Sequence, residues 1–219
     1  MDWQERLECF IASLMDDEPE LLARIRADAD ESFVPIVRRE TAQLLAVLAR
    51  ISGPADILEV GTGSGYSGIL MLLNSPCGAR LTSIESCRQR YEAAVKNFEL
   101  AGLSGQARLI CGDALEVLPE LPGTYDLIFM DAAKGQYINF FEDIIRLLGP
   151  GGILISDNIF QDGTIIGSRY AIERRDRTIH KRMRDYLYTL EHTPGLTTAL
   201  LNTGDGVALS VKDHGEAVH

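Results

Sequence analysis

Short apolar segments, several of them ending in an acidic residue, alternate along this chain with longer segments of helical periodicity. The apolar segments are continuous rather than alternating, which is typical of strands buried on both faces of a sheet. Strands of this kind that are joined by helices form a doubly wound, mostly parallel α/β sheet. The expected strands are 56–60, 80–85, 107–111, 125–131 and 152–156.

The two ends of the chain extend this pattern. Strands at 197–202 and 206–212 flank Thr203-Gly204-Asp205-Gly206, a hairpin sequence that predicts an antiparallel C-terminal strand and seven strands in all. Three helices precede the first strand, at roughly 2–14, 18–30 and 36–51. They could pack on the domain, cover a site or build a dimer. Because no repeat or linker interrupts the chain, we expect a single domain over residues 1–219.

Charge and composition exclude several classes of protein. The formal net charge of −11 disfavours a surface that binds nucleic acid everywhere, although it allows a local basic patch. No apolar run approaches the ~20 residues of a membrane span, and the N-terminus lacks the features of a signal peptide. The four cysteines lack metal-ligand spacing. We therefore expect reduced thiols and a cytoplasmic protein.

A glycine loop follows the first expected strand. Glycines at 61, 63 and 65 allow a ligand to approach the backbone, and the next helix offers free amide groups. A dinucleotide fingerprint would require glycine at position 66, where this chain has Tyr66. Together with the absence of a Tyr-x-x-x-Lys pair, this disfavours a nicotinamide-dependent oxidoreductase.

Acidic residues end or follow the neighbouring strands. Glu85 ends the second strand, where a carboxylate can accept both hydroxyls of a ribose, or can simply be a solvated charge. Asp113 follows the third strand, where it can bind an adenine amino group or cap the next helix. With Glu59 and the glycine loop, these residues predict a nucleoside pocket. Their order resembles that of class I S-adenosylmethionine-dependent methyltransferases.

A second set of polar residues ends the fourth and fifth strands. Asp131, Asp157 and Asn158 should lie side by side there, because the two strands are adjacent. Their oxygens are the hard ligands that Mg²⁺ prefers, and a cation would offset the repulsion of paired carboxylates. The alternative is a helix cap at Asp131 and a turn at Asp157-Asn158.

Lys134 stands three residues after Asp131. Near a divalent cation, its amine could take or stabilise the proton of a substrate hydroxyl, whose oxygen then attacks the sulfonium methyl group. A surface lysine is the alternative interpretation.

The motifs EVGTGSGYS, IE at 84–85, GDAL, FMDAAKGQY and SDN together resemble the cation-dependent O-methyltransferases of the catechol and caffeoyl-CoA type. The resemblance extends from Val34 onward and implies a homodimer that uses S-adenosylmethionine and Mg²⁺ or Mn²⁺. It implies catalytic roles for Lys134 and Asp131, and metal ligation by Asp131, Asp157 and Asn158. The cofactor-binding positions are Val37, Glu59, Gly61, Thr62, Ser67, Glu85, Ala114 and Asp131, together with Asp113.

A basic segment follows the SDN motif. Between 169 and 184 there are seven Lys or Arg residues against two acids, and an apolar stripe of Ile172, Ile179, Met183 and Leu187 is expected at helical spacing. Arginines beside the site suit phosphate recognition, although a solvated amphipathic helix is the usual explanation of such a run. The candidate contacts are Arg169, Arg174, Arg175, Arg177, Lys181 and Arg182.

This segment is similar to that of the bacterial branch that methylates 5-hydroxyuridine at the wobble position of tRNA, which implies a tRNA anticodon loop as the partner and 5-methoxyuridine as the product. A small catechol or phenol is the alternative acceptor. Caffeoyl-CoA is another, with the arginines binding its phosphates. A non-catalytic binding module is a further possibility that the intact Asp131, Lys134, Asp157 and Asn158 set disfavours.

Overall fold

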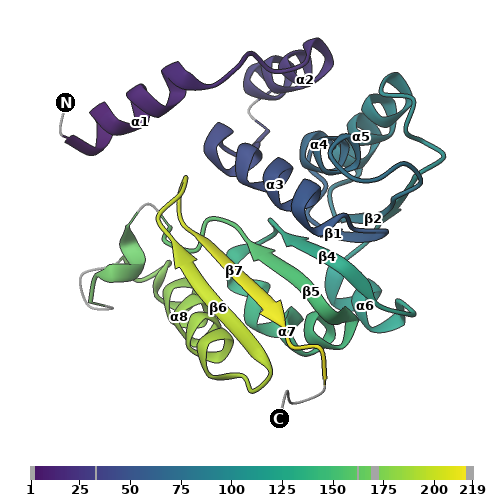
Figure 1. The fold of residues 1–219 in the computed structure, drawn as a ribbon. Helices are drawn as coiled ribbons and strands as arrows, with labels where there is room; N and C mark the ends of the chain where they lie inside the picture. The colour runs from purple at the N-terminus through teal and green to yellow at the C-terminus, as the bar shows by residue number, and fades with distance from the viewer. Residues whose placement is uncertain (1–2, 33, 162, 169–172, 216–219) are drawn as a thin grey trace.

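Seven strands form one sheet in the computed structural model, which describes residues 3–32, 34–161, 163–168 and 173–215 (Figure 1). The spatial order is β3-β2-β1-β4-β5-β7-β6. β7 runs opposite to the other described strands, which confirms the predicted sheet. The strands are β1 (Asp56–Val60), β2 (Arg80–Glu85), β3 (Ala107–Cys111), β4 (Tyr125–Met130), β5 (Leu148–Ser156), β6 (Leu196–Leu201) and β7 (Val207–Lys212).

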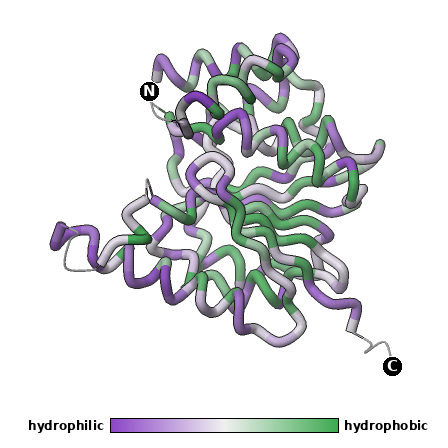
Figure 2. The backbone as a smooth tube through the Cα atoms, turned by 60° about the vertical axis from the view of Figure 1, so that its left-hand side comes forward, coloured by the Kyte–Doolittle hydropathy of each residue, from purple (hydrophilic) through white to green (hydrophobic). Residues whose placement is uncertain are grey.

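Helices cover both faces of the sheet (Figure 1). Alternate strand residues point to opposite faces, so Ile57 and Phe129 belong to one apolar core, and Leu58 and Met130 to the other. The strands are accordingly apolar in the middle of the molecule (Figure 2). One face carries α2 (Glu20–Glu31), α3 (Arg39–Ser52), α4 (Tyr66–Leu73) and α5 (Arg88–Leu100), and the other carries α6 (Ala114–Glu120), α7 (Tyr137–Leu147) and α8 (Arg177–His192).

The N-terminal helices match the sequence prediction in number but not in all their bounds. α1 spans Trp3–Leu14, and α3 begins at Arg39 rather than near residue 36. Residues 34–38 are not helical, and Pro35 disfavours helical backbone at Val34, the residue before it. Gly53 ends α3 with φ 55°, as its position predicts. Within the described residues, no helix combines the length and apolar character needed to cross a membrane.

The fifth strand starts four residues before the predicted position. Gly149, Pro150 and Gly151 look like a turn in the sequence, but they lie within β5 at an irregularity of its pairing with β4. Such a bulge accommodates a proline and a glycine with φ 73° at Gly151. At the other end, β5 stops at Ser156 and β4 at Met130. The candidate residues Asp131 and Asp157 therefore follow their strands directly.

The order of strands reverses between β1 and β4. β2 and β3 lie on one side of β1, whereas β5, β7 and β6 lie beyond β4. In open α/β sheets, ligands bind outside the carboxyl ends of the strands at such a switch point. Two short 3₁₀ helices, η1 (Lys134–Gln136) and η2 (Thr164–Ile166), lie in the segments that follow β4 and β5.

Candidate active site

A cleft of about 590 Å³ opens at the switch point. Loops after β1, β2, β3 and β4 line it, and so does segment 35–38. Two predicted residues, Glu59 and Asp157, do not line this cleft, because they are almost completely buried. The predicted residues in its wall are Val37, Gly61, Thr62, Ser67, Glu85, Asp113, Ala114, Asp131, Lys134 and Asn158.

The glycine loop makes close backbone contacts. Gly61 has φ 104°, and a Cβ atom there would come within 2.0 Å of the carbonyl oxygen of Asp131. The amides of Gly61 and Thr62 both donate to the Ile84 carbonyl oxygen, at 2.9 and 3.2 Å. No side chain fits at Gly61, and the loop is therefore fixed against the ends of both β2 and β4.

A buried chain of hydrogen bonds lies beneath this loop. Ser67 and Ser83 each donate to the Glu59 carboxylate at 2.5 Å, and the Thr62 and Ser83 hydroxyls lie 2.6 Å apart. Burial raises the pKa of Glu59 to about 7 against the effect of these donors, and the nearby charge of Asp131 adds to the rise. Glu59 therefore holds Ser67 and, through Ser83, Thr62 in the cleft wall. Ser83 was not predicted, although it is a polar residue in an apolar strand.

Glu85 has each carboxylate oxygen bound to backbone. One oxygen accepts from the Gly63 amide at 2.9 Å and the other from the Cys87 amide at 2.8 Å. Each carboxylate oxygen can accept a second hydrogen bond, so Glu85 can still accept from a ligand. Asp113 accepts from the Leu115 amide at 2.9 Å, and this is the helix cap that the sequence allowed.

The ends of β4 and β5 bring the predicted metal ligands together. Burial raises the pKa of Asp157 to about 6, and the charge of Asp131 contributes to the rise. The Asp157 carboxylate accepts from the backbone amide of Asn158 at 2.8 Å. Asn158 has φ 53°, which is unusual for a residue other than glycine. Among the described residues, no group of three or more His, Cys, Asp or Glu could hold a metal. The predicted set instead combines two carboxylates with one amide oxygen.

Lys134 lies between these carboxylates and a buried tyrosine. Its Nζ donates to Asp131 Oδ1 at 2.6 Å and to the Tyr137 hydroxyl at 3.2 Å. That hydroxyl lies 2.9 Å from the Met130 carbonyl oxygen and 3.2 Å from that of Asp157, and either can accept its proton. Tyr137 thus connects Lys134 with the ends of both strands. Sequence reasoning missed this role, although Tyr137 ends the KGQY stretch.

A second hollow of about 420 Å³ adjoins the cleft and shares Lys134 and Asn158 with it. The side-chain nitrogen of Gln161 is buried here and has no hydrogen-bond partner among the described residues. This hollow provides space for a second ligand beside Lys134. Its other lining residues are Thr164, Asp176, Ile179, His180 and Asp205, none of which was predicted for the site.

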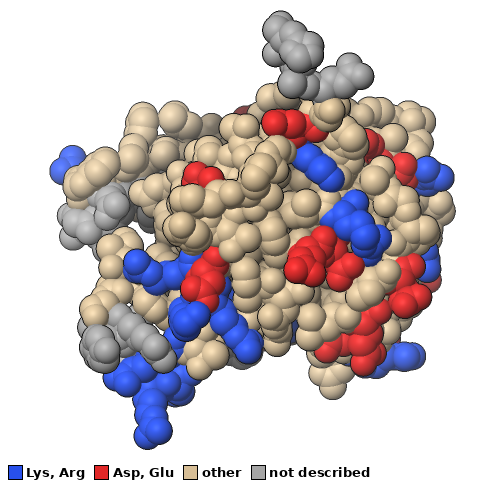
Figure 3. All heavy atoms as spheres, turned by 90° about the horizontal axis from the view of Figure 1, so that it is seen from below, with Lys and Arg blue, Asp and Glu red and all other residues tan. Residues whose placement is uncertain are grey.

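The described part of the basic segment lies beside this hollow, because Asp176, Ile179 and His180 belong to its lining. Arg174, Arg175 and Lys181 are exposed, whereas Arg177 and Arg182 are half-buried. Arg182 donates to the Gly135 carbonyl oxygen at 3.2 Å and so contacts the turn that carries Lys134. Lys and Arg side chains gather at one corner of the molecule in the view from below (Figure 3). Arg169 lies outside the described residues.

The apolar face of α8 differs from the predicted stripe. Met183 is buried and Leu187 half-buried as expected, but Ile179 is 39% exposed. His180 is buried in its place and its Nε2 lies 3.2 Å from the Gly167 carbonyl oxygen. The helix is therefore rotated relative to the prediction, and Tyr186 and Leu190 complete the buried face. Ile172 lies outside the described residues.

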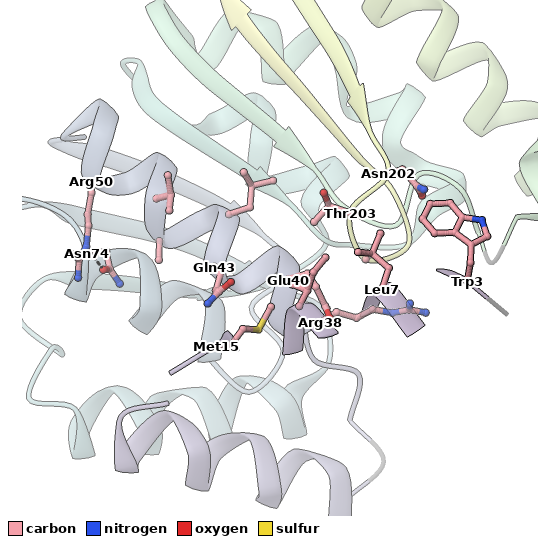
Figure 4. A pocket seen from close by; sticks show the side chains of 15 residues that line it. Trp3, Leu7, Met15, Arg38, Glu40, Gln43, Arg50, Asn74, Asn202 and Thr203 are labelled. Carbon is pink, nitrogen blue, oxygen red and sulfur yellow. Dashed lines mark hydrogen bonds between the residues drawn. The ribbon is translucent and has the colours of Figure 1, made fainter. Parts of the chain in front are cut away.

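A third hollow, of about 780 Å³, lies away from these residues between α1, α3 and the β6–β7 turn (Figure 4). Trp3 and Leu7 of α1 line it from one side and Thr203 of the turn from another. None of the residues predicted for catalysis, cofactor or metal belongs to its lining.

Residues 13–213 match the family described as O-methyltransferase. A catechol O-methyltransferase of Niastella koreensis is 32% identical over 168 residues, which cover 74% of this chain and 76% of that protein. A caffeoyl-CoA O-methyltransferase of Citrus natsudaidai is 28% identical, over 90% of this chain and 89% of its own. The solved O-methyltransferase TomG of Streptomyces achromogenes, in complex with SAM, superposes with a TM-score of 0.85 at 27% identity, over 97% of this chain and 100% of its own.

Proposed function

Because the chain belongs to the O-methyltransferase family, we propose that it transfers a methyl group from S-adenosylmethionine to a hydroxyl of an acceptor with two neighbouring oxygens. One observation carries this proposal. The cleft that contains the glycine loop and Glu85 adjoins a second hollow, and Lys134 and Asn158 line both. A methyl donor in the cleft and an acceptor in the hollow would meet beside Lys134.

The cleft provides groups for each part of the methyl donor. Glu85 would accept from the ribose hydroxyls, because its carboxylate keeps free lone pairs at the cleft wall. The Ser67 hydroxyl, held by the buried Glu59, would face the methionine part. Asp113 and Ala114 line the cleft near the end of β3, where the adenine would lie.

The residues at the ends of β4 and β5 fit a divalent cation. Asp131, Asp157 and Asn158 offer the oxygen ligands that Mg²⁺ or Mn²⁺ takes, and the raised pKa of Asp157 reflects its burial beside a second negative charge that a cation would compensate. A cation bound there would make an acceptor hydroxyl more acidic and orient its oxygen.

The chain's own residues would perform the rest of the reaction. Lys134 would accept or stabilise the proton of the acceptor hydroxyl, while Asp131 and Tyr137 hold its Nζ in place. The acceptor oxygen forms a bond to the methyl carbon as the carbon–sulfur bond breaks. The products are the methyl ether, S-adenosylhomocysteine and one proton.

For the acceptor, we propose a catechol or related phenol that enters the second hollow. The support is the similarity to catechol and caffeoyl-CoA O-methyltransferases together with the size of the hollow, about 420 Å³. Drug-sized ligands occupy pockets of roughly 300–1,000 Å³.

The basic segment supports a second candidate acceptor, 5-hydroxyuridine at the wobble position of tRNA. O5 and the neighbouring O4 of this base have the spacing of catechol oxygens. Exposed Arg174, Arg175 and Lys181 lie next to the hollow, where they could contact phosphates of an anticodon loop.

The test supplies labelled S-adenosylmethionine and one of two acceptors, a simple catechol or tRNA carrying 5-hydroxyuridine, with Mg²⁺ or with a chelator. We expect chelator-sensitive methylation of the catechol, identified by mass spectrometry. 5-Methoxyuridine far in excess of catechol product would make the tRNA the acceptor. Failure to methylate either acceptor and to bind S-adenosylhomocysteine would contradict the proposed function.

A triple variant separates the two acceptors further. Arg174, Arg175 and Arg177 changed to glutamate would abolish methylation of tRNA but leave catechol turnover within about twofold, because none of the three lines the hollow. Methylation of tRNA that survives this change would exclude the basic segment as its contact.

We also propose that the protein is a homodimer, as its resemblance to the cation-dependent O-methyltransferases implies. Large apolar side chains of α1 and α3 are exposed, among them Trp3 at 70% and Ile51 at 75%. A second copy that covers such side chains would gain the usual free energy of apolar burial. Light scattering on the full chain measures the assembly state directly.

A further inference from the structure

Tyr66, which takes the place of a fingerprint glycine, is buried and bonded to the N-terminal part of the chain. Its hydroxyl donates to Oε1 of Glu18, which lies in the link between α1 and α2. The Arg26 guanidinium donates twice to the same carboxylate, from Nε and Nη2, each at 2.9 Å. It also lies 4.5 Å above the centre of the Tyr66 ring. These three residues form one cluster, which we call the Glu18–Arg26–Tyr66 cluster.

The cluster also holds one wall of the cofactor cleft. Arg26 Nη1 donates to the Val37 carbonyl oxygen at 2.9 Å, and Val37 belongs to segment 35–38, which lines the cleft. This segment approaches the glycine loop closely, since a Cβ atom on Gly63 would lie 3.8 Å from the Pro35 carbonyl oxygen. Segment 35–38 therefore depends on Arg26 on one side and faces the glycine loop on the other.

The cluster is built to remain ionised although it is removed from water. The side chains of Arg26 and Glu18 are 17% and 16% exposed. Burial opposes ionisation of Glu18, but the hydrogen bonds from Arg26 and Tyr66 outweigh it and keep the pKa of Glu18 below its usual value. Bidentate pairing of this kind fixes geometry as well as contributing energy. Removing one partner would leave the others buried without their donors or acceptors.

Tyr66 connects this cluster to the methyl-donor site directly. It is the first residue of α4, it follows Gly65 of the glycine loop, and it is among the residues that line the cleft. Ser67, the proposed contact to the methionine part, comes next in the chain. A shift of Tyr66 would therefore move the start of α4 and the residues that bind the donor.

We propose that the Glu18–Arg26–Tyr66 cluster positions segment 35–38 against the glycine loop, so that docking of the N-terminal helices and binding of the S-adenosyl ligand are coupled. The inference rests on the proposed function, because it assigns that ligand to the cleft. The three residues are positioning residues rather than catalytic ones. By linkage, the bound ligand stabilises the docked N-terminal segment to the same extent as the docked segment favours the ligand.

Calorimetry with S-adenosylhomocysteine tests the coupling. Arg26→Met and Glu18→Gln should each raise the Kd by at least about fivefold, the lower end of typical coupling between sites. Tyr66→Phe, which removes a single hydroxyl and keeps the ring, should raise it less. Arg24→Met is the matched control, because Arg24 is an exposed arginine of the same helix and should leave the Kd unchanged. In turnover, the KM for S-adenosylmethionine should rise in the variants and that for the acceptor should not.

Hydrogen exchange provides a readout that a purely structural role would not move. In the wild-type protein, S-adenosylhomocysteine should slow exchange of the backbone amides of residues 34 and 36–38, and this protection should be lost in Arg26→Met. The effects of Glu18→Gln and Tyr66→Phe on the Kd should be less than additive, because the two side chains share one hydrogen bond.

Two negative results have different meanings. A wild-type protein that does not bind S-adenosylhomocysteine would overturn the proposed function and the coupling with it. Tight binding by the wild-type protein, with an unchanged Kd in both Arg26→Met and Tyr66→Phe, would overturn the coupling alone.

Discussion

The carboxylates on the two halves of the sheet edge differ in their hydrogen-bond partners and in their nearby charges. On the β1–β3 side, Glu59 accepts from two serine hydroxyls and Glu85 from two backbone amides. On the β4–β5 side, Asp131 pairs with Lys134, and Asp157 lies buried close enough to Asp131 for its pKa to rise. The first half supplies its own donors, whereas the second carries negative charge that its own residues compensate only in part.

This difference agrees with the tasks proposed for the two halves. Hydrogen bonds already made within the protein fix the shape of the donor cleft before a ligand enters. Carboxylates that are only partly compensated raise the free energy of the metal-free protein and thereby favour binding of a cation. The pKa of Tyr137 lies well above its usual value because of burial and then of both aspartates, another sign of the negative potential at this end.

The largest effect should follow from changing the β4–β5 side. Asp157→Ala should lower kcat by about a thousandfold or more, because metal-assisted reactions gain several kcal/mol from the ion. Binding of S-adenosylhomocysteine should persist, since Asp157 does not line the cleft. Turnover and calorimetry measure the two quantities, with exposed Asp30→Ala as the control. An unchanged rate would contradict a role for a metal at Asp157 in the reaction.

Removing the amine of Lys134 should have the next largest effect on the rate. Lys134→Met should lower kcat by about 10²–10⁴-fold, the usual contribution of a general base. Affinity for S-adenosylhomocysteine should fall much less, because Glu85 and the glycine loop remain intact. The control is Lys96→Met, because Lys96 is on α5 and lines neither the cleft nor the second hollow. Equal losses in rate and in ligand affinity would mean that Lys134 shapes the cleft rather than acting on the acceptor.

Stability should depend on pH in a direction set by the raised pKa values. Burial raises the pKa of Asp157 to about 6 and that of Glu59 to about 7 in the folded protein. Between about pH 4 and these values, the folded protein therefore holds protons that the unfolded chain has already released. Without metal, the free energy of unfolding should therefore fall as pH rises from about 4 to 7. Asp157→Asn should raise it at pH 8, by on the order of 3 kcal/mol.

Urea unfolding in the presence of a chelator measures this change, and Mg²⁺ should restore stability to the wild-type protein but not to the variant. A variant that is less stable than the wild-type protein at pH 8 would show that the ionised Asp157 carboxylate does not destabilise the metal-free fold.

The smallest effect should come from the β1–β3 side. Ser67→Ala removes one donor to Glu59 and should cost about 1–3 kcal/mol of stability, because a buried acceptor loses its partner. Ser75→Ala, near the end of the same helix, removes a hydrogen bond to the Met71 carbonyl and should cost less. Equal costs in thermal unfolding would mean that Glu59 does not depend on its donors.

The sequence was sufficient to predict the sheet and to bring together Asp131, Lys134, Asp157 and Asn158. Continuous apolar strands with polar ends carry this information directly. The early start of β5 was missed because Gly149-Pro150-Gly151 has turn composition, and its incorporation in a bulge depends on pairing with β4.

Side-chain partners from distant segments were not predictable in the same way. Tyr137, Gln161 and Asp205 border the predicted site, but their positions depend on how helices and the β6–β7 turn pack against the sheet. Two hydrogen bonds join this turn to the segment after β5, from the Ile159 amide to the Gly206 carbonyl and from the Phe160 amide to that of Asp205. Periodicity carries no information about such contacts between remote segments.

The contact between Gly61 and the Asp131 carbonyl oxygen has a consequence for changing this protein. It fixes the spacing between the glycine loop and the end of β4 with main-chain atoms alone. The proposed acceptor hollow is lined by other residues, among them Thr164 and Ile179. A library that varies Thr164 and Ile179 in the outer hollow could therefore alter acceptor preference and leave the alignment of the transferred group unchanged.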